Sequence, residues 1–392
     1  MPPAFTLGIL GGGQLGRMMA LAARRLGCRV WTLDPGADPP CAQAADGHIR
    51  APFGDARAAL RLARRCDALT CEFENVPAAV LEALERAGRT VHPGSAGLRT
   101  AQDRLVEKRF LRGLGIPVAD YREILRREDL GAAEREIGFP AVLKTARGGY
   151  DGKGQAVARC RAQAAAAFAR LGGGRGAPLV WERLVPFVKE LGAVCARNAA
   201  GAFAMFPPAE NVHRGGILRL TLAPARISRE TELRLRSLAR RIADGLSLTG
   251  TFCVETFLLA DGTLLVNEIA PRPHNCGHYT LDACATSQFE QHVRAVCGLP
   301  LGSTRLLSPA AMVNILGTGA GDALTGVARA LAEPSVKLHL YGKREARAGR
   351  KMGHLTALGG SAAAARRRAL AAGGELAWAR GAGAAGFPGG WK

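Results

Sequence analysis

Aromatic side chains and long apolar runs are both scarce in this sequence of 392 residues. Phe, Trp and Tyr together make up 5% of the chain, too few for the stacked side chains that hold single-stranded nucleic acids. No stretch reaches the roughly 20 apolar residues of a membrane span, and the first residues lack the basic and apolar regions of a secretory signal peptide. We therefore expect a cytoplasmic protein without membrane contact.

Paired cysteine motifs and acidic residues are also in short supply. The ten cysteines are scattered singly, without C-x-x-C spacing, which predicts reduced and buried thiols. Asp and Glu number 33 against 53 Lys and Arg, and the net charge of +20 would suit a nucleic-acid ligand. The arginines, however, alternate with Ala and Leu at helical spacing, as in 61–65 and 236–241, which is typical of solvated helix faces. We expect no nucleic-acid partner, whereas small anionic substrates remain compatible with the charge.

Residues 5–92 alternate strand and helix patterns, which predicts a doubly wound parallel sheet. In its first turn Gly11, Gly13 and Gly16 fit G-x-G-x-x-G, and Asp34 follows about 20 residues later. An NAD-dependent oxidoreductase would use this turn for its dinucleotide. A glycine turn at a helix N-terminus nevertheless favours any phosphate, so the pattern leaves the ligand open.

The rest of the chain mixes helices with short strands and predicts an α+β arrangement. A helix should end at Gly115, and the elements expected after it are a strand at 138–144, a glycine-rich loop at 146–155, strands at 181–198 and 201–208, a helix at 229–243, a hairpin at 251–270, a loop at 267–280, a helix at 287–299 and further strands within 304–360. From residue 361 the chain is rich in Ala, Gly and Arg, which predicts a flexible tail.

The hairpin brings two acidic residues together. If the Asp-Gly pair at 261–262 forms a two-residue turn, Ala260 pairs with Thr263, and counting outward places Glu255 opposite Glu268. Their Cβ atoms would lie about 5 Å apart, where like charges repel unless a cation neutralises them. Carboxylate oxygens without thiol or imidazole partners favour Mg²⁺ bridging a substrate phosphate. Two exposed acids on an edge hairpin, or a longer turn that breaks the register, are the alternatives.

The glycine-rich loop RGGYDGKGQ is not a Walker A motif, since it lacks G-x-x-x-x-G-K-[ST]. Its glycines on both sides of Lys153 let the backbone approach phosphate oxygens and let the loop close as a lid. Lys144, at the end of the preceding strand, adds a point charge suited to phosphate. A plain surface turn is the alternative.

Three segments together carry a family resemblance: GGYDGKGQ, NEIAPRPHNCGHYT and YGKREARAGRKMGH. They resemble the 5-(carboxyamino)imidazole ribonucleotide synthetases, ATP-grasp enzymes of purine biosynthesis, and the likeness extends from residue 5 to about residue 357 and includes GGGQLGRM. The resemblance implies a homodimer, and it implies that the first glycine turn helps to receive a ribonucleotide and not NAD. The domains that it implies are a pre-ATP-grasp domain at 1–98, an ATP-grasp domain at 99–303 with a lid at about 119–185, a small β-rich C-terminal domain at 304–360, and the tail at 361–392.

The reaction implied by the resemblance uses ATP and Mg²⁺. ATP phosphorylates bicarbonate to carboxyphosphate, which carboxylates the exocyclic amine of 5-aminoimidazole ribonucleotide and leaves ADP and phosphate. A related ATP-grasp ligase that acts on another amine is the nearest alternative, and an NAD-dependent oxidoreductase is a remote one.

The resemblance also implies the site residues, position by position. The ATP-binding positions are Arg104, Lys144, Gly149, Tyr150, Asp151, Gly152, Lys153, Gly154, Gln155, Glu182, Arg183, Leu184, Val185, Glu190, His213, Asn267 and Glu268. Glu255 and Glu268 match the magnesium ligands, in agreement with the hairpin count. The substrate positions are Gln14, Leu15, Glu74, Tyr150, Asp151, Lys153, Arg272, Lys343 and Arg350, and the catalytic ones are Arg272, His274, Asn275 and Lys153.

Three positions depart from the family pattern, which usually has Ser at Cys276, a polar residue at Gly192 and Pro at Ala348. The sequence HNCGH could also suggest a zinc cluster of His274, Cys276 and His278. The prolines and glycine around it argue against the helix that would align an i, i+4 pair, so we expect no zinc site from this motif.

Overall fold

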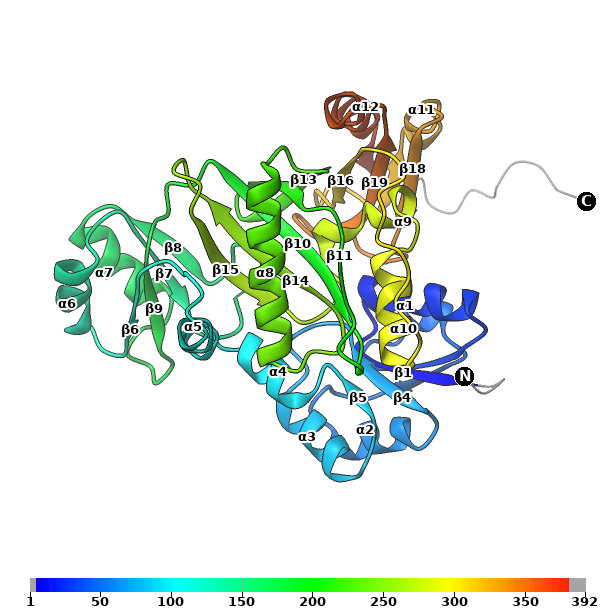
Figure 1. Cartoon of the computed structure of the whole chain (residues 1–392), viewed down its shortest axis with the longest axis horizontal. Helices are drawn as coiled ribbons and strands as arrows, with labels where there is room; N and C mark the ends of the chain where they lie inside the picture. Colours follow the sequence, from blue (N-terminus) through cyan, green and yellow to red (C-terminus); the bar gives the residue numbers. More distant parts are fainter. Residues whose placement is uncertain (1–4, 150, 381–392) are drawn as a thin grey trace, which may run out of the picture.

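The computed structural model describes residues 5–149 and 151–380, and three large sheets organise this part of the chain (Figure 1). A five-stranded sheet forms the N-terminal region, a four-stranded sheet forms a projection on one side, and a nine-stranded sheet runs through the centre into the C-terminal region. None of the helices in these residues is long and apolar enough to cross a membrane.

The N-terminal sheet is parallel throughout, in the order β3-β2-β1-β4-β5. Its central strand β1, with the sequence TLGIL, is buried along its whole length, as expected for a strand covered on both faces. The predicted doubly wound sheet is therefore confirmed. The elements are β1 (Thr6–Leu10), α1 (Gln14–Arg25), β2 (Arg29–Asp34), η1 (Ala42–Ala44), β3 (Gly47–Arg50), α2 (Ala56–Ala63), β4 (Ala68–Cys71), α3 (Ala78–Arg86), β5 (Val91–His92) and α4 (Ser95–Ala101).

The four-stranded sheet is antiparallel, in the order β6-β9-β7-β8. Helix α5 (Arg104–Gly113) leads into it, with the Asp103 carboxylate capping its first turn, and Gly115 takes a φ of 62° just beyond its end. The other elements are β6 (Tyr121–Ile124), α6 (Asp129–Glu136), β7 (Ala141–Thr145), β8 (Gln155–Ala158), α7 (Arg161–Arg170) and β9 (Leu179–Arg183).

The nine-stranded sheet has the order β15-β14-β10-β12-β13-β16-β19-β18, with β11 paired to β10. Because β13 pairs with β16, the C-terminal strands extend the central sheet. The strands are β10 (Lys189–Arg197), β11 (Phe203–Met205), β12 (Ala209–Arg214), β13 (Ile217–Ala223), β14 (Gly250–Leu258), β15 (Leu264–Ala270), β16 (Ala310–Leu316), β18 (Val336–Leu340) and β19 (Lys351–Leu358). The expected strands at 181–198 are present, but β9 and β10 belong to different sheets.

Helices cover the central sheet and join it to the N-terminal region. Helix α8 (Arg229–Gly245) packs Leu235, Ala239 and Ile242 into the core of one face (Figure 1). Helix α10 (Gln288–Val296) packs between α1 and β14. Before it, the chain forms two short turns, η2 (Asn275–Gly277) and α9 (Thr280–Ala283). Through these contacts α10 joins one face of the parallel sheet to the central sheet.

The β14–β15 hairpin pairs Glu255 with Glu268, but it does so by a route that differs from the predicted one. The N–H of Leu259 donates to the carbonyl of Thr263, so the turn holds three residues and not two, which shifts the pairing by one position. A bulge at Asn267 then shifts it back. The two deviations cancel, and the acidic side chains face each other as expected.

The expectation of a flexible tail from residue 361 is wrong for 361–380. Helix α12 (Ala362–Gly374) begins at the capping hydroxyl of Ser361 and buries Ala365, Ala369 and Ala372. These alanines join the core formed by β16 and β19. Beyond the helix, β20 (Ala377–Ala379) pairs with β17 (Ala323–Thr325), next to the short helix α11 (Val327–Ala330). Residues 381–392 lie outside the described part of the chain.

Candidate active site

A cleft of about 970 Å³ lies where the three large sheets meet. Apart from Gly154, it is lined by all of the predicted site residues that the structure describes, namely Gln14, Leu15, Glu74, Arg104, Lys144, Gly149, Asp151, Gly152, Lys153, Gln155, Glu182, Arg183, Leu184, Val185, Glu190, His213, Glu255, Asn267, Glu268, Arg272, His274, Asn275, Lys343 and Arg350. Tyr150 lies outside the described residues. Segments far apart in the sequence thus converge on one concave surface.

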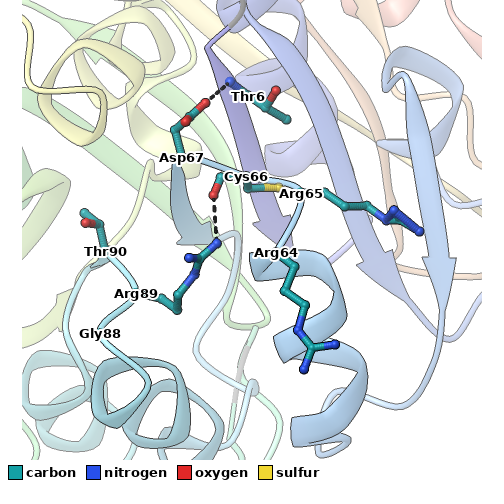
Figure 2. A pocket seen from close by; sticks show the side chains of 8 residues that line it. All are labelled: Thr6, Arg64, Arg65, Cys66, Asp67, Gly88, Arg89 and Thr90. Atoms are coloured by element: carbon teal, nitrogen blue, oxygen red, sulfur yellow. Dashed lines mark hydrogen bonds between the residues drawn. The ribbon is translucent and has the colours of Figure 1, made fainter.

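A smaller hollow of about 470 Å³ lies at the opposite end of the parallel sheet (Figure 2). Arginines dominate its lining, but the groups that Figure 2 joins by dashed lines bind one another: Asp67 accepts from the N–H of Thr6 at 2.7 Å, and Arg89 donates to the Cys66 carbonyl at 3.4 Å. Ligands of open α/β sheets bind beyond the carboxyl ends of the strands. The large cleft lies at that end, and this hollow does not.

The glycine turn before α1 already holds two carboxylates of the protein itself. Glu72, just after β4, accepts hydrogen bonds from the backbone N–H groups of Gly13 and Gly16, the latter at 2.7 Å. Asp34 accepts from the N–H of Gly12 at 2.8 Å. A dinucleotide would need these amides for its pyrophosphate and the acid for its ribose. In the turn that suggested an NAD-dependent oxidoreductase, the amides of Gly12, Gly13 and Gly16 are therefore not free for a dinucleotide. For the same reason, the N–H groups of Gly13 and Gly16 do not bind a substrate phosphate.

Three carboxyl groups crowd the floor of the cleft. Burial, with the neighbouring Glu268, raises the pKa of Glu255 to about 7. The same two causes raise the pKa of Glu107, which accepts from the N–H of Ile269 at 2.6 Å, to about 8. Burial would also raise the pKa of Glu268, but Arg104, whose guanidinium lies 3.3 Å away, brings it below its ordinary value. The raised pKa values show that the carboxyl groups disfavour one another's ionisation, and this set of oxygen donors fits a divalent cation.

Glu182, at the end of β9, is held between two lysines. Lys144 lies 2.9 Å from one carboxylate oxygen and Lys108 lies 3.3 Å from the other. Burial alone would raise the pKa of Glu182, yet the two ammonium groups lower it to about 2. Lys108 is 1% exposed and was not among the predicted residues. In the sequence it belongs to a charged helical segment that resembles a solvated surface, and only the fold turns it inward.

A histidine and a glutamate face each other on neighbouring strands of the central sheet. Glu190 on β10 is hydrogen-bonded to the Nδ1 atom of His213 on β12. Burial lowers the pKa of His213, but the Glu190 contact and the nearby Glu255 outweigh it, so the pKa lies above its ordinary value. His213 is therefore readily protonated and can act as a hydrogen-bond donor beside the carboxyl groups.

The loop after β15 supplies a cation, an imidazole and an amide to the cleft. Arg272 forms an ion pair with Glu74 at 2.8 Å, which links this loop to the N-terminal region. His274 points its Nε2 atom to Glu255 at 3.3 Å, and burial together with Arg272 holds the pKa of His274 well below its ordinary range. Asn275 is fixed by reciprocal hydrogen bonds with Asn314 at 3.0 and 2.7 Å.

The C-terminal segment before β19 contributes further cations. Burial, with the nearby Arg350, lowers the pKa of Lys343 to about 8, and its ammonium group donates to the Lys351 carbonyl at 2.7 Å. Lys351 itself pairs with Asp151 of the glycine-rich loop at 2.7 Å. Lys351 was not predicted, although it lies directly beside Arg350 in the quoted motif. This contact ties the loop to the central sheet.

Three family models match consecutive parts of the chain. The ribonucleotide synthetase preATP-grasp domain matches residues 4–102, the ATP-grasp domain matches 109–289, and the phosphoribosylaminoimidazole carboxylase C-terminal domain matches 310–368. Together with the three sheets and the cleft between them, these matches define an ATP-grasp enzyme.

Curated relatives and solved structures narrow the family. The N5-carboxyaminoimidazole ribonucleotide synthase of Bacillus subtilis is 46% identical over 358 residues, covering 90% of this chain and 91% of the relative. That of Brucella melitensis is 45% identical, covering 91% and 97%. The crystal structure of the ADP complex of N5-carboxyaminoimidazole ribonucleotide synthetase matches with a TM-score of 0.89 at 45% identity, covering 95% of this chain and 97% of that one. The Aspergillus clavatus enzyme, in complex with ADP and 5-aminoimidazole ribonucleotide, matches with a TM-score of 0.88 at 33% identity, covering 96% and 99%. The chain belongs to the N5-carboxyaminoimidazole ribonucleotide synthase family, as its motifs predicted.

Proposed function

We propose that the chain uses ATP and bicarbonate to carboxylate the exocyclic amine of 5-aminoimidazole ribonucleotide, giving 5-carboxyaminoimidazole ribonucleotide, ADP and phosphate for purine biosynthesis. The observation that carries the proposal is the convergence, in one cleft, of facing carboxylates, a lysine-bound glutamate and cations from two further segments. Membership of the family supplies the substrate class.

The nucleotide lies between the four-stranded and nine-stranded sheets. The end of β9 and the residues after it, 182–185, read the adenine and the ribose, with Glu182 kept ionised by Lys108 and Lys144. Lys144 and Arg104, which both line the cleft, contact the phosphates. The remaining ATP positions are Gly149, Asp151, Gly152, Lys153, Gly154 and Gln155 of the lid loop, together with Arg183, Leu184, Val185, Glu190, His213, Asn267 and Glu268.

Glu255 and Glu268 are the residues that would hold Mg²⁺. The crowding of their charges, which raises the pKa of Glu255 to about 7, is what a divalent cation would relieve. When bound there, Mg²⁺ would supply positive charge that stabilises the ATP phosphates and the phosphoryl group in transfer. The hairpin fixes both carboxylates on adjacent strands, so this part of the chain is ordered before the cation arrives.

The chemistry proceeds in two displacements. A bicarbonate oxygen attacks the terminal phosphorus of ATP and ADP leaves. The amine nitrogen then attacks the carbon of carboxyphosphate, the C–O bond to phosphate breaks, and the departing phosphate takes up the proton that the nitrogen loses. Arg272 and Lys153 stabilise the negative charge of carboxyphosphate, away from bulk water. His274 stays neutral, since burial lowers its pKa, and with Asn275 it positions the reacting carbonyl group.

The ribonucleotide binds on the side of the cleft towards the N-terminal region. Lys343 and Arg350 hold its 5′-phosphate through charge-assisted hydrogen bonds. The other groups that face it are Gln14, Leu15, Glu74 and Asp151. The Arg272–Glu74 ion pair bridges the carboxyphosphate and ribonucleotide ends of the site.

The proposal also covers the cellular location, the oligomeric state and the division into domains. The chain acts in the cytoplasm as a homodimer. Its functional division follows the expected domains at 1–98, 99–303 with the lid at about 119–185, and 304–360, to which α12 is added. Ion-pair and sheet contacts between these regions keep the cleft assembled.

Phosphate release from ATP and bicarbonate, measured with and without 5-aminoimidazole ribonucleotide, tests the function. We expect phosphate release to depend on bicarbonate, and the carboxylated ribonucleotide to accumulate when 5-aminoimidazole ribonucleotide is added. Bicarbonate-dependent release that never yields the carboxylated ribonucleotide would instead favour a ligase acting on another amine. ATP turnover alone does not separate the two, because carboxyphosphate decomposes in water.

A further inference from the structure

Two cysteines and a histidine form a compact cluster beneath the cleft, on the far side of His274 from the carboxyl groups. The Sγ atoms of Cys253 and Cys276 lie 3.6 Å apart, and the Nδ1 atom of His274 lies 3.0 Å from the Cys276 Sγ. The ligand atoms of the three residues all lie within 4.8 Å of one another. Strand β14 supplies one thiol, η2 supplies the other, and His274 lies at the start of η2.

The imidazole of His274 faces two different environments. The backbone N–H of Cys276 points to Nδ1 at 3.4 Å, so Nδ1 offers a lone pair, while Nε2 lies 3.3 Å from a carboxylate oxygen of Glu255. Histidines that bind zinc typically direct one ring nitrogen to the metal and the other to a carboxylate. His274 has this arrangement, with one nitrogen beside the thiols and the other beside Glu255. Glu255 is thus already in place as the residue that orients the ligand His274 from outside the metal site.

We propose that Cys253, His274 and Cys276 bind a thiophilic divalent cation, with Zn²⁺ as the model, at a site separate from the magnesium carboxylates. Thiolate sulfur and imidazole nitrogen select such cations, whereas the carboxylate oxygens of Glu255 and Glu268 select Mg²⁺. Binding forms two sulfur–metal bonds and one nitrogen–metal bond, and the two thiol protons pass to the solvent.

The distances suit this assignment. With Zn–S near 2.3 Å and tetrahedral angles, two sulfurs stand about 3.8 Å apart and a sulfur and a nitrogen about 3.6 Å apart. The two sulfurs are already separated by 3.6 Å, so the thiols need almost no movement, and the imidazole must withdraw by about half an ångström.

The surroundings leave room for the cluster and give access to it. A Cβ atom at Gly192 would lie 2.6 Å from the Cys276 Sγ, so the glycine is what admits this thiol beside β10. Both thiols are fully buried, whereas His274 lines the cleft. A cation therefore reaches the sulfurs past the imidazole, and water is excluded once it is bound.

Cobalt is the sharpest probe, because Co²⁺ bound to thiolates absorbs through sulfur-to-metal charge transfer. Full-length protein in excess Mg²⁺ and a non-chelating reductant is titrated with Co²⁺ and then with Zn²⁺. We expect a thiolate charge-transfer band that saturates at one equivalent and is displaced by one equivalent of Zn²⁺. A wild-type protein without this band overturns the proposal.

The variants locate the cation. Cys253→Ala and Cys276→Ser should each weaken zinc affinity by about a hundredfold or more, since losing an outer partner alone costs 10–100-fold. Cys160→Ala removes an exposed thiol outside the cluster and should leave the affinity unchanged. Unchanged affinity in both cluster variants, or its loss in Cys160→Ala, places the metal elsewhere and refutes the site.

Two controls separate metal binding from the folding of the variants and from carboxylation. Metal-free thermal melts show whether each variant folds, and Cys253→Ser is the substitute if Cys253→Ala does not. The readout is metal binding and not turnover, so the site can fail while the carboxylation proposal stands, and the reverse.

Discussion

The carboxylate of Glu72 accepts a hydrogen bond of 2.7 Å from the backbone N–H of Gly16, at the helix terminus where a dinucleotide would place its pyrophosphate. The protein thereby satisfies with its own side chain the amides that make this turn an anion site. A second carboxylate, that of Asp34, occupies the N–H of Gly12. The sequence pattern of a phosphate-binding turn is thus present, but its backbone N–H groups already bind carboxylates of the protein itself.

We expect the protein to bind ATP and ADP but not NAD. Titration calorimetry with each ligand, in the presence of Mg²⁺, checks this. Glu72→Gln keeps the shape of the side chain and should not create NAD affinity, because its amide still fills the turn. Tight NAD binding by the wild type, without binding of ATP, would contradict both the site assignment and the proposed function.

Lys144→Ala and Arg104→Ala should each reduce kcat/KM for ATP by roughly ten- to a hundredfold. Each change removes a charge-assisted contact to phosphate worth about 1.5–3 kcal/mol. Steady-state kinetics with varied ATP measure the loss. Arg109→Ala is the matched control, since Arg109 lies on the same helix as Arg104 but pairs with Glu123 at the surface. Wild-type ATP kinetics in both test variants would mean that the nucleotide lies elsewhere.

Arg272→Ala and Lys343→Ala should retain ATP binding yet lose the carboxylated ribonucleotide. Neither side chain contacts the lysine–glutamate network around Glu182, whereas both line the other part of the cleft. The product itself is measured, because ADP accumulates whenever carboxyphosphate decomposes. Normal product formation by both variants would refute their assignment.

The charge on Lys343 adds a pH signature to the same test. Burial and Arg350 lower the pKa of Lys343 to about 8, so its ammonium form is lost as pH rises through that value. We expect kcat/KM for the ribonucleotide to fall above about pH 8, and Lys343→Arg to move this fall upward because arginine stays charged. An identical profile in both proteins would assign the titration to another group.

The hairpin illustrates what the sequence predicts and what it cannot. Alternating apolar residues around an Asp-Gly turn are enough to indicate facing glutamates, because the side-chain period of a strand is two. The three-residue turn is made by local contacts, with Gly262 at a φ of 85°, and an Asp-Gly pair also suits a two-residue turn, so the sequence does not choose between them. The pairing was predicted correctly because the shift at the turn and the bulge at Asn267 cancel. Glu72 and Lys108 show the same limit, since each acquires its role from a strand or helix distant in sequence.

Helix α12 was missed for a compositional reason. Its buried face consists of Ala365, Ala369 and Ala372, whose small side chains barely differ in hydrophobicity from the alanines on the exposed face. The periodic signal is therefore weak, although the spacing is helical. The parallel sheet, by contrast, is predicted readily, because its central strands β1 and β4 are largely apolar runs that are buried along their whole length.

Glu268→Gln should raise the Mg²⁺ concentration needed for turnover and lower kcat by far more than it lowers stability. The amide keeps a coordinating oxygen but removes a charge that the cation needs, and it also leaves Arg104 without its carboxylate partner. Magnesium titrations of turnover, compared with thermal melts, measure the two effects. Asp261→Asn, in the exposed turn of the same hairpin, serves as the control. If Glu268→Gln kept the wild-type rate and magnesium dependence, Glu255 and Glu268 would be acidic residues that do not hold the cation.

Without metal, the contribution of Glu255 to stability should fall as pH rises from about 4.5 to about 7. The pKa of Glu255 is raised from 4.5 to about 7 by burial and by Glu268, so the folded state holds a proton that the unfolded state has released. This contribution is complete below about pH 4.5 and disappears through pH 7. The difference in Tm between the metal-free wild type and Glu255→Gln should therefore change across this range, and Mg²⁺ should remove the change. A difference that stays constant with pH would exclude this account of Glu255.

The pairing of β13 with β16 has a consequence for the order of events in turnover. Glu255, Glu268 and the strand that begins at Lys351 belong to one hydrogen-bonded sheet, whereas Lys144 and Glu182 belong to the four-stranded sheet. We expect that separating the two sheets releases ADP while the part of the site built by the nine-stranded sheet stays assembled. The Lys351–Asp151 ion pair spans that divide, so its rupture would time the departure of ADP.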